Sequence, residues 1–143
     1  MFLIGSRAAK YHFRNAREPN KDWDVWTTHQ ELIQWASKNN HRIKKFNLKA
    51  GKVFVTTFAK SVFEFTLIQP GSSAELFIKA NQSKDVIKIE GMDLVVAHPT
   101  VLILIKRSHL HLPIKWEKNI EDYHFLKTNN TYLHDRRLDY NQV

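Results

Sequence analysis

The stretch FLIGSRAAKYHFRNAREPNKDWDVW, Phe2 to Trp26, decides the fold prediction for this chain. Three apolar residues end at Gly5, which predicts a short buried strand, a tight turn and then a helix capped by Ser6. Glu18-Pro19-Asn20 predicts the end of that helix. Asp22 to Thr27 then alternates acidic with apolar residues, which predicts a strand that carries its carboxylates on one face.

The remaining chain predicts further strands and helices. Thr28 and Glu31, three residues apart, form a capping-box pair that predicts the start of a second helix. Lys49-Ala50-Gly51 predicts a hairpin turn between two strands, and Pro99 suits the first turn of a later helix. The predicted strands are residues 2–4, 22–27, 42–48, 52–58, 61–68, 85–89 and 93–96, and the predicted helices are residues 7–17, a helix from 28, 73–81, 99–109 and 114–127.

This order predicts an α+β fold, in which a β-sheet is flanked by helices and closed by a C-terminal helical pair. A length of 143 residues corresponds to one ordinary domain. We therefore predict a single domain over residues 1–128 and a polar tail, or partner-docking segment, over residues 129–143.

The composition favours a basic, globular protein. The 22 basic and 14 acidic residues give a formal net charge of +8, which favours nucleotides, nucleic acid or another polyanion as partners, unless it serves solubility alone. The absence of cysteine excludes disulfides, thiolate metal sites and cysteine nucleophiles. No apolar run approaches the roughly 20 residues of a membrane span and no secretory signal is visible, so we predict a cytoplasmic protein without a membrane partner. The oligomeric state stays open.

Two pairs of residues near the N-terminus could carry chemistry. Gly5-Ser6 precedes a predicted helix, whose first N–H groups and dipole attract anions such as phosphate. Asp22 and Asp24 share one strand face, where two like charges repel unless a cation compensates them. Mg²⁺ prefers such oxygen ligands together with substrate phosphate. Each pair is weak evidence alone, because capped turns and outward-facing acids are common.

Glu64 is the third candidate. It stands between Phe63 and Phe65 in a predicted strand that is otherwise apolar. A carboxylate there is unfavourable if it is buried without a partner or a metal. The residue is either an outward-facing acid on an amphipathic strand or a third carboxylate beside the aspartates.

The order of these elements resembles the nucleotidyltransferase superfamily of DNA polymerase β. The pattern is hydrophobic-Gly-Ser-Arg-Ala, a helix, Asp-hydrophobic-Asp-hydrophobic, and a later strand with an acid between hydrophobic residues. The GSRA form is particularly similar to the minimal and antibiotic-modifying members. The motifs span Phe2 to about Ile68, and LILIKRSH followed by WEKNIEDYHFL is similar to the lysine helix and the aspartate-bearing helix of minimal members.

This resemblance implies a nucleotidyltransferase-like mixed sheet and a set of site residues. In the family, the Gly-Ser pair holds the phosphates of a nucleoside triphosphate, the acid pair binds two divalent metals, and the third acid activates the attacking hydroxyl. The matching residues are Gly5, Ser6 and the adjacent Arg7 for phosphate, and Asp22, Asp24 and Glu64 for Mg²⁺ or Mn²⁺ and for catalysis.

The sequence departs from the family's pattern in two places. The 15 residues from Arg7 to Lys21 form a longer connection than usual, which predicts an extended helix and loop bearing His12, Arg14 and Arg17. Ala9-Lys10 replaces the usual small residue or glycine. The identity of the nucleotide therefore stays open.

A second group of candidates lies on the predicted helix of residues 99–109. Lys106 and His109, three residues apart, share one face of this helix, and His111 follows shortly after. Lys106 is the candidate for phosphate binding. The histidines either contact the triphosphate or the base, or form a zinc site with Asp122, or are ordinary hydrogen-bonded polar residues.

The sequence therefore predicts a metal-dependent nucleotidyltransferase that transfers a nucleoside monophosphate from a nucleoside triphosphate to a hydroxyl of a nucleic-acid end, a protein or a small molecule. The alternatives are a metal-dependent nuclease and a non-catalytic nucleic-acid- or partner-binding module. The acid site requires Glu64 to lie within about 4–6 Å of one aspartate, on the same sheet face. Otherwise Glu75 or Asp93 would have to supply the third acid. A branched side chain at Gly5 is expected to block phosphate and, if the turn is exposed, to leave stability almost unchanged.

Overall fold

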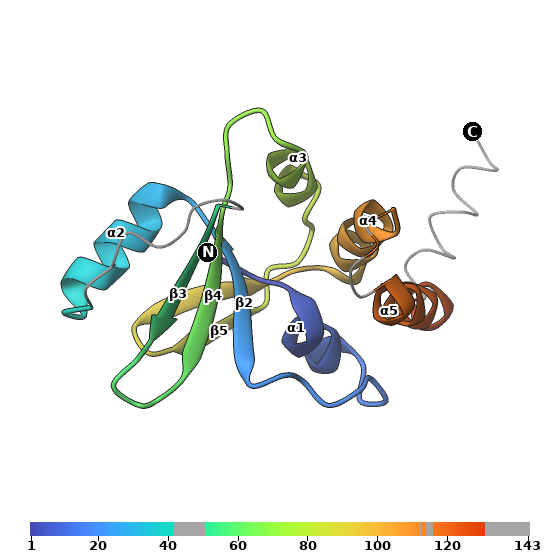
Figure 1. Cartoon of the computed structure of the whole chain (residues 1–143), viewed down its shortest axis with the longest axis horizontal. Coiled ribbons are helices and arrows are strands. Elements are labelled where there is room, and N and C mark those ends of the chain that lie inside the picture. The colour runs from blue at the N-terminus through green and yellow to red at the C-terminus, as the bar shows by residue number, and fades with distance from the viewer. Residues whose placement is uncertain (42–50, 112, 114–115, 131–143) are drawn as a thin grey trace.

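The computed structural model describes residues 1–41, 51–111, 113 and 116–130. Within these residues it contains a mixed β-sheet and surrounding helices (Figure 1). The strands are β1 (Phe2–Leu3), β2 (Asp22–Thr27), β3 (Lys52–Thr56), β4 (Val62–Leu67), β5 (Val86–Ile89) and β6 (Met92–Val96). The helices are α1 (Gly5–His12), α2 (His29–Lys38), α3 (Ser73–Lys79), α4 (Pro99–His109) and α5 (Trp116–Asn129). The predicted α+β class is confirmed at this level.

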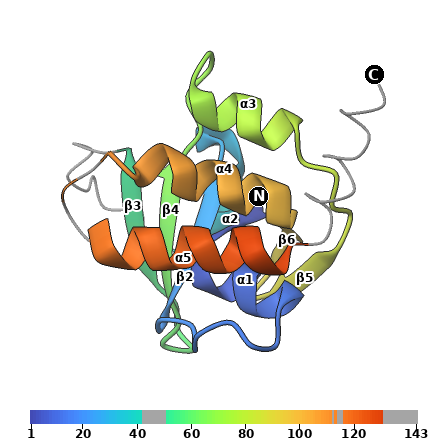
Figure 2. The same cartoon turned by 90° about the vertical axis from the view of Figure 1, so that its right-hand side faces the viewer.

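The sheet has the strand order β3-β4-β2-β1-β6-β5. Strand β2 pairs antiparallel with β1 and parallel with β4, and the two edge strands each pair antiparallel with a neighbour. Helix α2 lies on one side of the sheet, and α1, α4 and α5 lie on the other (Figure 1). Figure 2 shows α4 and α5 side by side, in front of the sheet and α1.

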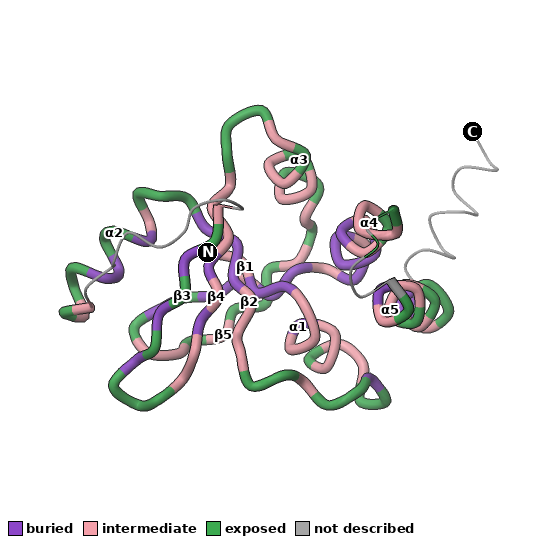
Figure 3. Tube along the Cα trace, viewed as in Figure 1, coloured by how far each residue is buried: buried purple, intermediate pink, exposed green. Residues whose placement is uncertain are grey.

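The core follows from the alternation of each strand. Val25, Phe63 and Phe65 are completely buried on one sheet face, and the indole of Trp35, on α2, packs against both phenylalanine rings. Figure 3 shows buried segments, in purple, along strands at the centre of the fold. The period-2 pattern therefore directs the apolar side chains of β2 and β4 towards α2, and Asp24 and Glu64 towards the opposite face.

The N-terminal helix differs from its prediction at both ends. It begins at Gly5, with Ile4 at the N-cap position and no side-chain cap, and ends at His12. Ser6 therefore lies inside the first turn, where its hydroxyl accepts the N–H of Asn20 at 3.3 Å. The prediction of Ser6 as a cap and of a helix to residue 17 was wrong, because Phe13 adopts an extended conformation and starts a loop back to β2.

Other boundaries agree closely with the predictions. The capping box of Thr28 and Glu31 is present at the start of α2, and β2 and α4 have their predicted limits. Strand β3 pairs with β4 through a turn closed by the Thr57 N–H and the Ser61 carbonyl. The predicted strand at residues 42–48, and hence its hairpin with β3, lies outside the described residues, as does the tail from residue 131 onward. Helix α5 continues to Asn129. Within the described part of the chain, no helix is long and apolar enough to cross a membrane.

Candidate functional site

Asp24 and Glu64 form an acid pair on the sheet face opposite α2. Strands β2 and β4 run parallel, with Asp24 in register with Glu64, and the two side chains share a hydrogen bond. The pKa of Asp24 is raised to about 6, first by burial and then by the hydrogen bond and charge of Glu64, against the smaller lowering by the charges of Lys52 and Lys106. The acid pair therefore keeps a proton up to a higher pH than an isolated carboxyl group does.

Lys52 supplies the nearest cation to this pair. Its Nζ lies 2.7 Å from Oε1 of Glu64, and the side chain, on edge strand β3, is 45% exposed against 20% for Glu64. Lys52 opposes Thr66 in the antiparallel register, so it reaches Glu64 diagonally across the strands. The ion pair neutralises one acid of the pair from the solvent side.

Gly5 places the N-terminus of α1 against Asp24. Its φ of +72° lies in the left-handed region, and a Cβ at this position would overlap the Asp24 carboxylate. The Ile4 N–H donates to the Asp24 carbonyl at 3.0 Å, which fixes the turn onto β2. Only glycine combines this backbone conformation with such close approach. The sequence-based expectation of almost unchanged stability applied to an exposed turn, and Gly5 does not meet that condition, because Asp24 occupies the space that a larger side chain requires.

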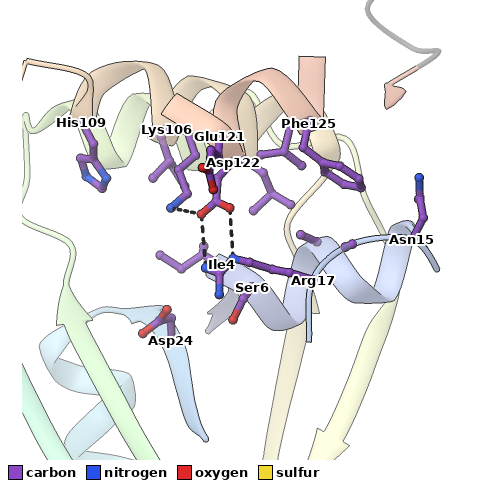
Figure 4. A pocket seen from close by; sticks show the side chains of 16 residues that line it. Ile4, Ser6, Asn15, Arg17, Asp24, Lys106, His109, Glu121, Asp122 and Phe125 are labelled. Carbon is purple, nitrogen blue, oxygen red and sulfur yellow. Dashed lines mark hydrogen bonds and ion pairs between the residues drawn. The ribbon is translucent and has the colours of Figure 1, made fainter. Parts of the chain in front are cut away.

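A pocket of about 390 Å³ opens from Asp24 between α1, the loop that follows it, α4 and α5. Figure 4 shows Asp24 and Ser6 on one side of the pocket and Asp122 on the other, with Lys106 and His109 above. Its polar lining comprises Ser6, Asn15, Arg17, Asp24, Lys106, His109, Glu121 and Asp122, and its apolar lining comprises Ile4, Ala9, Ala16, Leu102, Ile105, Phe125 and Leu126, with Gly5 at the turn. The volume suits a small ligand such as a nucleoside.

Asp122 joins two cations across this pocket. Arg17 approaches its carboxylate with Nε at 3.1 Å and Nη2 at 3.2 Å, and Lys106 Nζ lies 2.9 Å from Oδ2. Burial raises the pKa of Asp122, but the hydrogen bonds and charges of Arg17 and Lys106 outweigh burial and hold it below its ordinary value. The loop after α1, α4 and α5 are thereby held together at the pocket.

His109 lines the pocket close to these cations. Burial lowers the pKa of His109, and the charges of Lys106, Lys52 and His111 lower it further. The imidazole is therefore predominantly neutral near pH 7. Asp122 is engaged by Arg17 and Lys106, and no group of three or more metal-binding side chains is found among the described residues. The structure thus gives no support to the zinc-site alternative for His109, His111 and Asp122.

The other predicted site residues lie in different surroundings. Asp22 is on the same strand face as Asp24, about 7 Å along β2, and does not converge with the acid pair into a cluster of three ligands. The Arg7 guanidinium stacks on Trp23, with Cζ 4.1 Å from the ring centroid, and donates to the Lys21 carbonyl. Gly5, Ser6, Asp24 and Lys106 meet at the pocket, whereas Arg7, Asp22 and Glu64 are not among the residues that line it.

Two residues of the site, Arg17 and Lys52, were not predicted from the sequence as site residues. Arg17 stands out only as part of the longer connection before Asp22, and its partner Asp122 is 105 positions away. Lys52 could have been found from the hairpin, since alternation places it on the same face as Glu64 once β3 and β4 are paired.

Comparison with known proteins identifies one family. The model described as "Domain of unknown function (DUF7277)" matches residues 1–129. The chain belongs to the DUF7277 family. The matched DUF7277 region contains the acid pair, the Gly5 turn and the three helices of the pocket. No curated protein matches the sequence.

Proposed function

We propose that this protein is a metal-dependent nucleotidyltransferase that transfers a nucleoside monophosphate from a nucleoside triphosphate to a hydroxyl acceptor. One observation carries the proposal. The Asp24 carboxylate, which shares a hydrogen bond with Glu64, lies directly against the Gly5 turn that begins α1 and lines a pocket that also contains Lys106. The fold we propose is accordingly nucleotidyltransferase-like, with the glycine-serine turn after β1, the aspartates on β2 and the third acid on β4.

The acid pair fits a divalent cation. Asp24 and Glu64 share a hydrogen bond and the pKa of Asp24 is raised. Two carboxylates this close repel each other when both are ionised, and a cation removes that repulsion. Asp24 and Glu64 would hold Mg²⁺ or Mn²⁺ through oxygen ligands, whereas Asp22 lies about 7 Å along the same strand face. The metal would neutralise charge on the transferring phosphoryl group.

The protein's own groups have defined roles in this proposal. The first N–H groups of α1 and the Ser6 hydroxyl bind the phosphates. The Lys106 ammonium leaves its ion pair with Asp122 and binds a phosphate oxygen. Glu64 accepts the proton of the acceptor hydroxyl. The acceptor oxygen then bonds to the α-phosphorus, while the bond to the bridging oxygen breaks and pyrophosphate leaves.

The test is nucleotide binding followed by transfer. Calorimetry with each nucleoside triphosphate should show binding that requires Mg²⁺, and α-labelled nucleotide should be transferred to a component of cell extract. Asp24→Asn should abolish transfer in a folded protein, and Asp93→Asn, a change at an exposed acid on β6, should not. Cleavage of an oligonucleotide without nucleotide would indicate a nuclease instead. Nucleic-acid binding that chelator does not affect, without nucleotide binding, would indicate a non-catalytic module.

A further inference from the structure

The acid pair has a second neighbouring surface besides the pocket. In register across three strands, Phe54 on β3 opposes Glu64 on β4, which is next to Asp24 on β2. Because neighbouring strands are about 4.8 Å apart, Phe54 lies about 10 Å from Asp24 on the same sheet face. Strand β1, which leads into the Gly5 turn, lies on the other side of β2. The acids thus lie between the phosphate-binding turn and Phe54.

This surface is exposed and carries an aromatic ring beside a cation. Phe54 is 44% exposed, and the side chain of Lys52, two residues earlier on the same face, is 45% exposed. Thr56 continues the exposed row. Single exposed aromatic rings are common on protein surfaces, and Phe54 is distinguished by its position beside Lys52 and the acid pair.

Two lysines act on the groups of this surface. Burial raises the pKa of Asp24 and lowers that of His109, and the charges of Lys52 and Lys106 act to lower both pKa values. The whole chain has a formal net charge of +8. An anionic partner is therefore favoured over a neutral or basic one.

We propose that Phe54 and Lys52 form an acceptor site for the end of a single-stranded nucleic acid, in which Phe54 stacks on a base and Lys52 binds a phosphate. This inference rests on the proposed transferase function, because in-line transfer requires the acceptor to approach opposite the leaving pyrophosphate. The leaving group lies towards the Gly5 turn, so the acceptor enters from the β3 side. An exposed aromatic ring next to a cation is the combination that binds single strands with little sequence preference.

The experiment measures the binding of a fluorescein-labelled ten-nucleotide single strand with a free 3′ hydroxyl by anisotropy. Phe54→Ala should weaken binding about 5- to 100-fold, and Phe54→Tyr should restore most of it. Phe58→Ala is the matched aromatic control, because Phe58 is 82% exposed but stacks on His41, which stacks on Trp35 of α2. The control should bind as the wild type does.

The contribution of the Lys52 charge is tested separately. Lys52→Ala should weaken binding and reduce the slope of log K against log salt by about 0.7. Lys88→Ala removes the same charge from exposed β5, at the opposite edge of the sheet, and should leave that slope almost unchanged. Equal effects of the two lysine variants would overturn the role of Lys52.

Parallel calorimetry with Mg²⁺ and nucleoside triphosphate separates this inference from the proposed function. Phe54→Ala should bind the nucleotide as the wild type does. Nucleotide binding without oligonucleotide binding, or oligonucleotide binding insensitive to Phe54→Ala, would overturn the acceptor site alone. Label transferred to protein or to a small molecule would also overturn it. If the wild type binds no nucleotide, the transferase proposal fails, and the acceptor role that rests on it fails with it.

Discussion

At the scale of single residues, the site depends on the close approach of Gly5 to Asp24 and on the repulsion between Asp24 and Glu64. Gly5 lies against the Asp24 carboxylate, and Asp24 shares a hydrogen bond with Glu64. Neither arrangement stabilises the isolated fold strongly, because the first restricts a position to glycine and the second brings two acids together. Such local conflicts are common at functional sites.

Gly5→Ala should destabilise the protein by more than Gly71→Ala. Both glycines have positive φ, +72° and +76°, so both alanines incur about 1–2 kcal/mol of backbone strain. A Cβ at position 71 meets nothing within 4 Å, whereas at position 5 it overlaps Asp24. The free energy of unfolding from urea denaturation measures the difference. An equal decrease in the free energy of unfolding of the two variants would show that the Asp24 side chain moves aside without an energetic cost.

Asp24→Asn should stabilise the metal-free protein at neutral pH. The pKa of Asp24 rises from 3.8 to about 6 on folding. The folded state therefore binds more protons, and the free energy of unfolding falls as the pH rises through this range. Removing the charge should raise the free energy of unfolding at pH 7 by about 1–3 kcal/mol and flatten its dependence on pH.

Thermal unfolding at several pH values, in chelator, measures this effect. Asp93→Asn is the control, since Asp93 is exposed on β6, and it should not change the profile. A less stable Asp24→Asn protein at pH 7 would contradict the repulsion between Asp24 and Glu64.

At the scale of elements, ion pairs attach the C-terminal helices to the N-terminal loop. Asp122 on α5 accepts from Arg17 on the loop and from Lys106 on α4. The three side chains are 17–40% exposed, so this network is screened less than a surface pair. It determines the width of the pocket, because each of its residues lines the wall.

Asp122→Asn should lower the free energy of unfolding at pH 7 by about 1–2 kcal/mol, because two charge-assisted interactions are weakened. The pKa of Asp122 is held below its ordinary value of 3.8 in the folded protein. Its contribution is therefore present above pH 3.8 and lost as the pH falls through the folded pKa, so the difference between variant and wild type should disappear in acid.

The matched control is Glu75→Gln on α3. Glu75 forms an i,i+4 pair with Lys79, whose side chain is 69% exposed, and such pairs contribute about 0.3–0.5 kcal/mol. Urea denaturation at pH 7 and in acid compares the two variants. Equal, small losses would show that the Asp122 network acts as an ordinary surface pair.

At the scale of the whole molecule, ligand binding should increase the free energy of unfolding. A ligand that binds only the folded state raises the free energy of unfolding by about 2.7 kcal/mol at 100 times its dissociation constant. Nucleoside triphosphate with Mg²⁺ should therefore raise the melting temperature by several degrees, about 2–4 °C per kcal/mol. Either component alone, or Glu64→Gln with both, should give a much smaller shift. A full shift in chelator would contradict the metal requirement.

The sequence alone predicted the features that depend on neighbouring residues. The glycine turn before α1, the alternation of β2 and β4 and the capping box of α2 are local patterns, because backbone conformation and hydrophobic period act over a few residues. They were sufficient for the α+β class and for the choice of Asp24 and Glu64 as acids on strands. The end of α1 was misjudged because helix propensity continues beyond His12, whereas the Lys10 ammonium binds the Arg14 and Ala16 carbonyls of the loop.

Only the tertiary structure decided which distant residues meet. The parallel pairing of β2 with β4 places Glu64 beside Asp24, and the antiparallel hairpin adds Lys52 to the same group. The return of α5 over α1 brings Asp122 to Arg17. Strand register and helix docking depend on the packing of the whole core, so no local pattern specifies these contacts. The sequence therefore determined the candidate acids and the glycine turn, and the packing of the chain determined the cations that surround them.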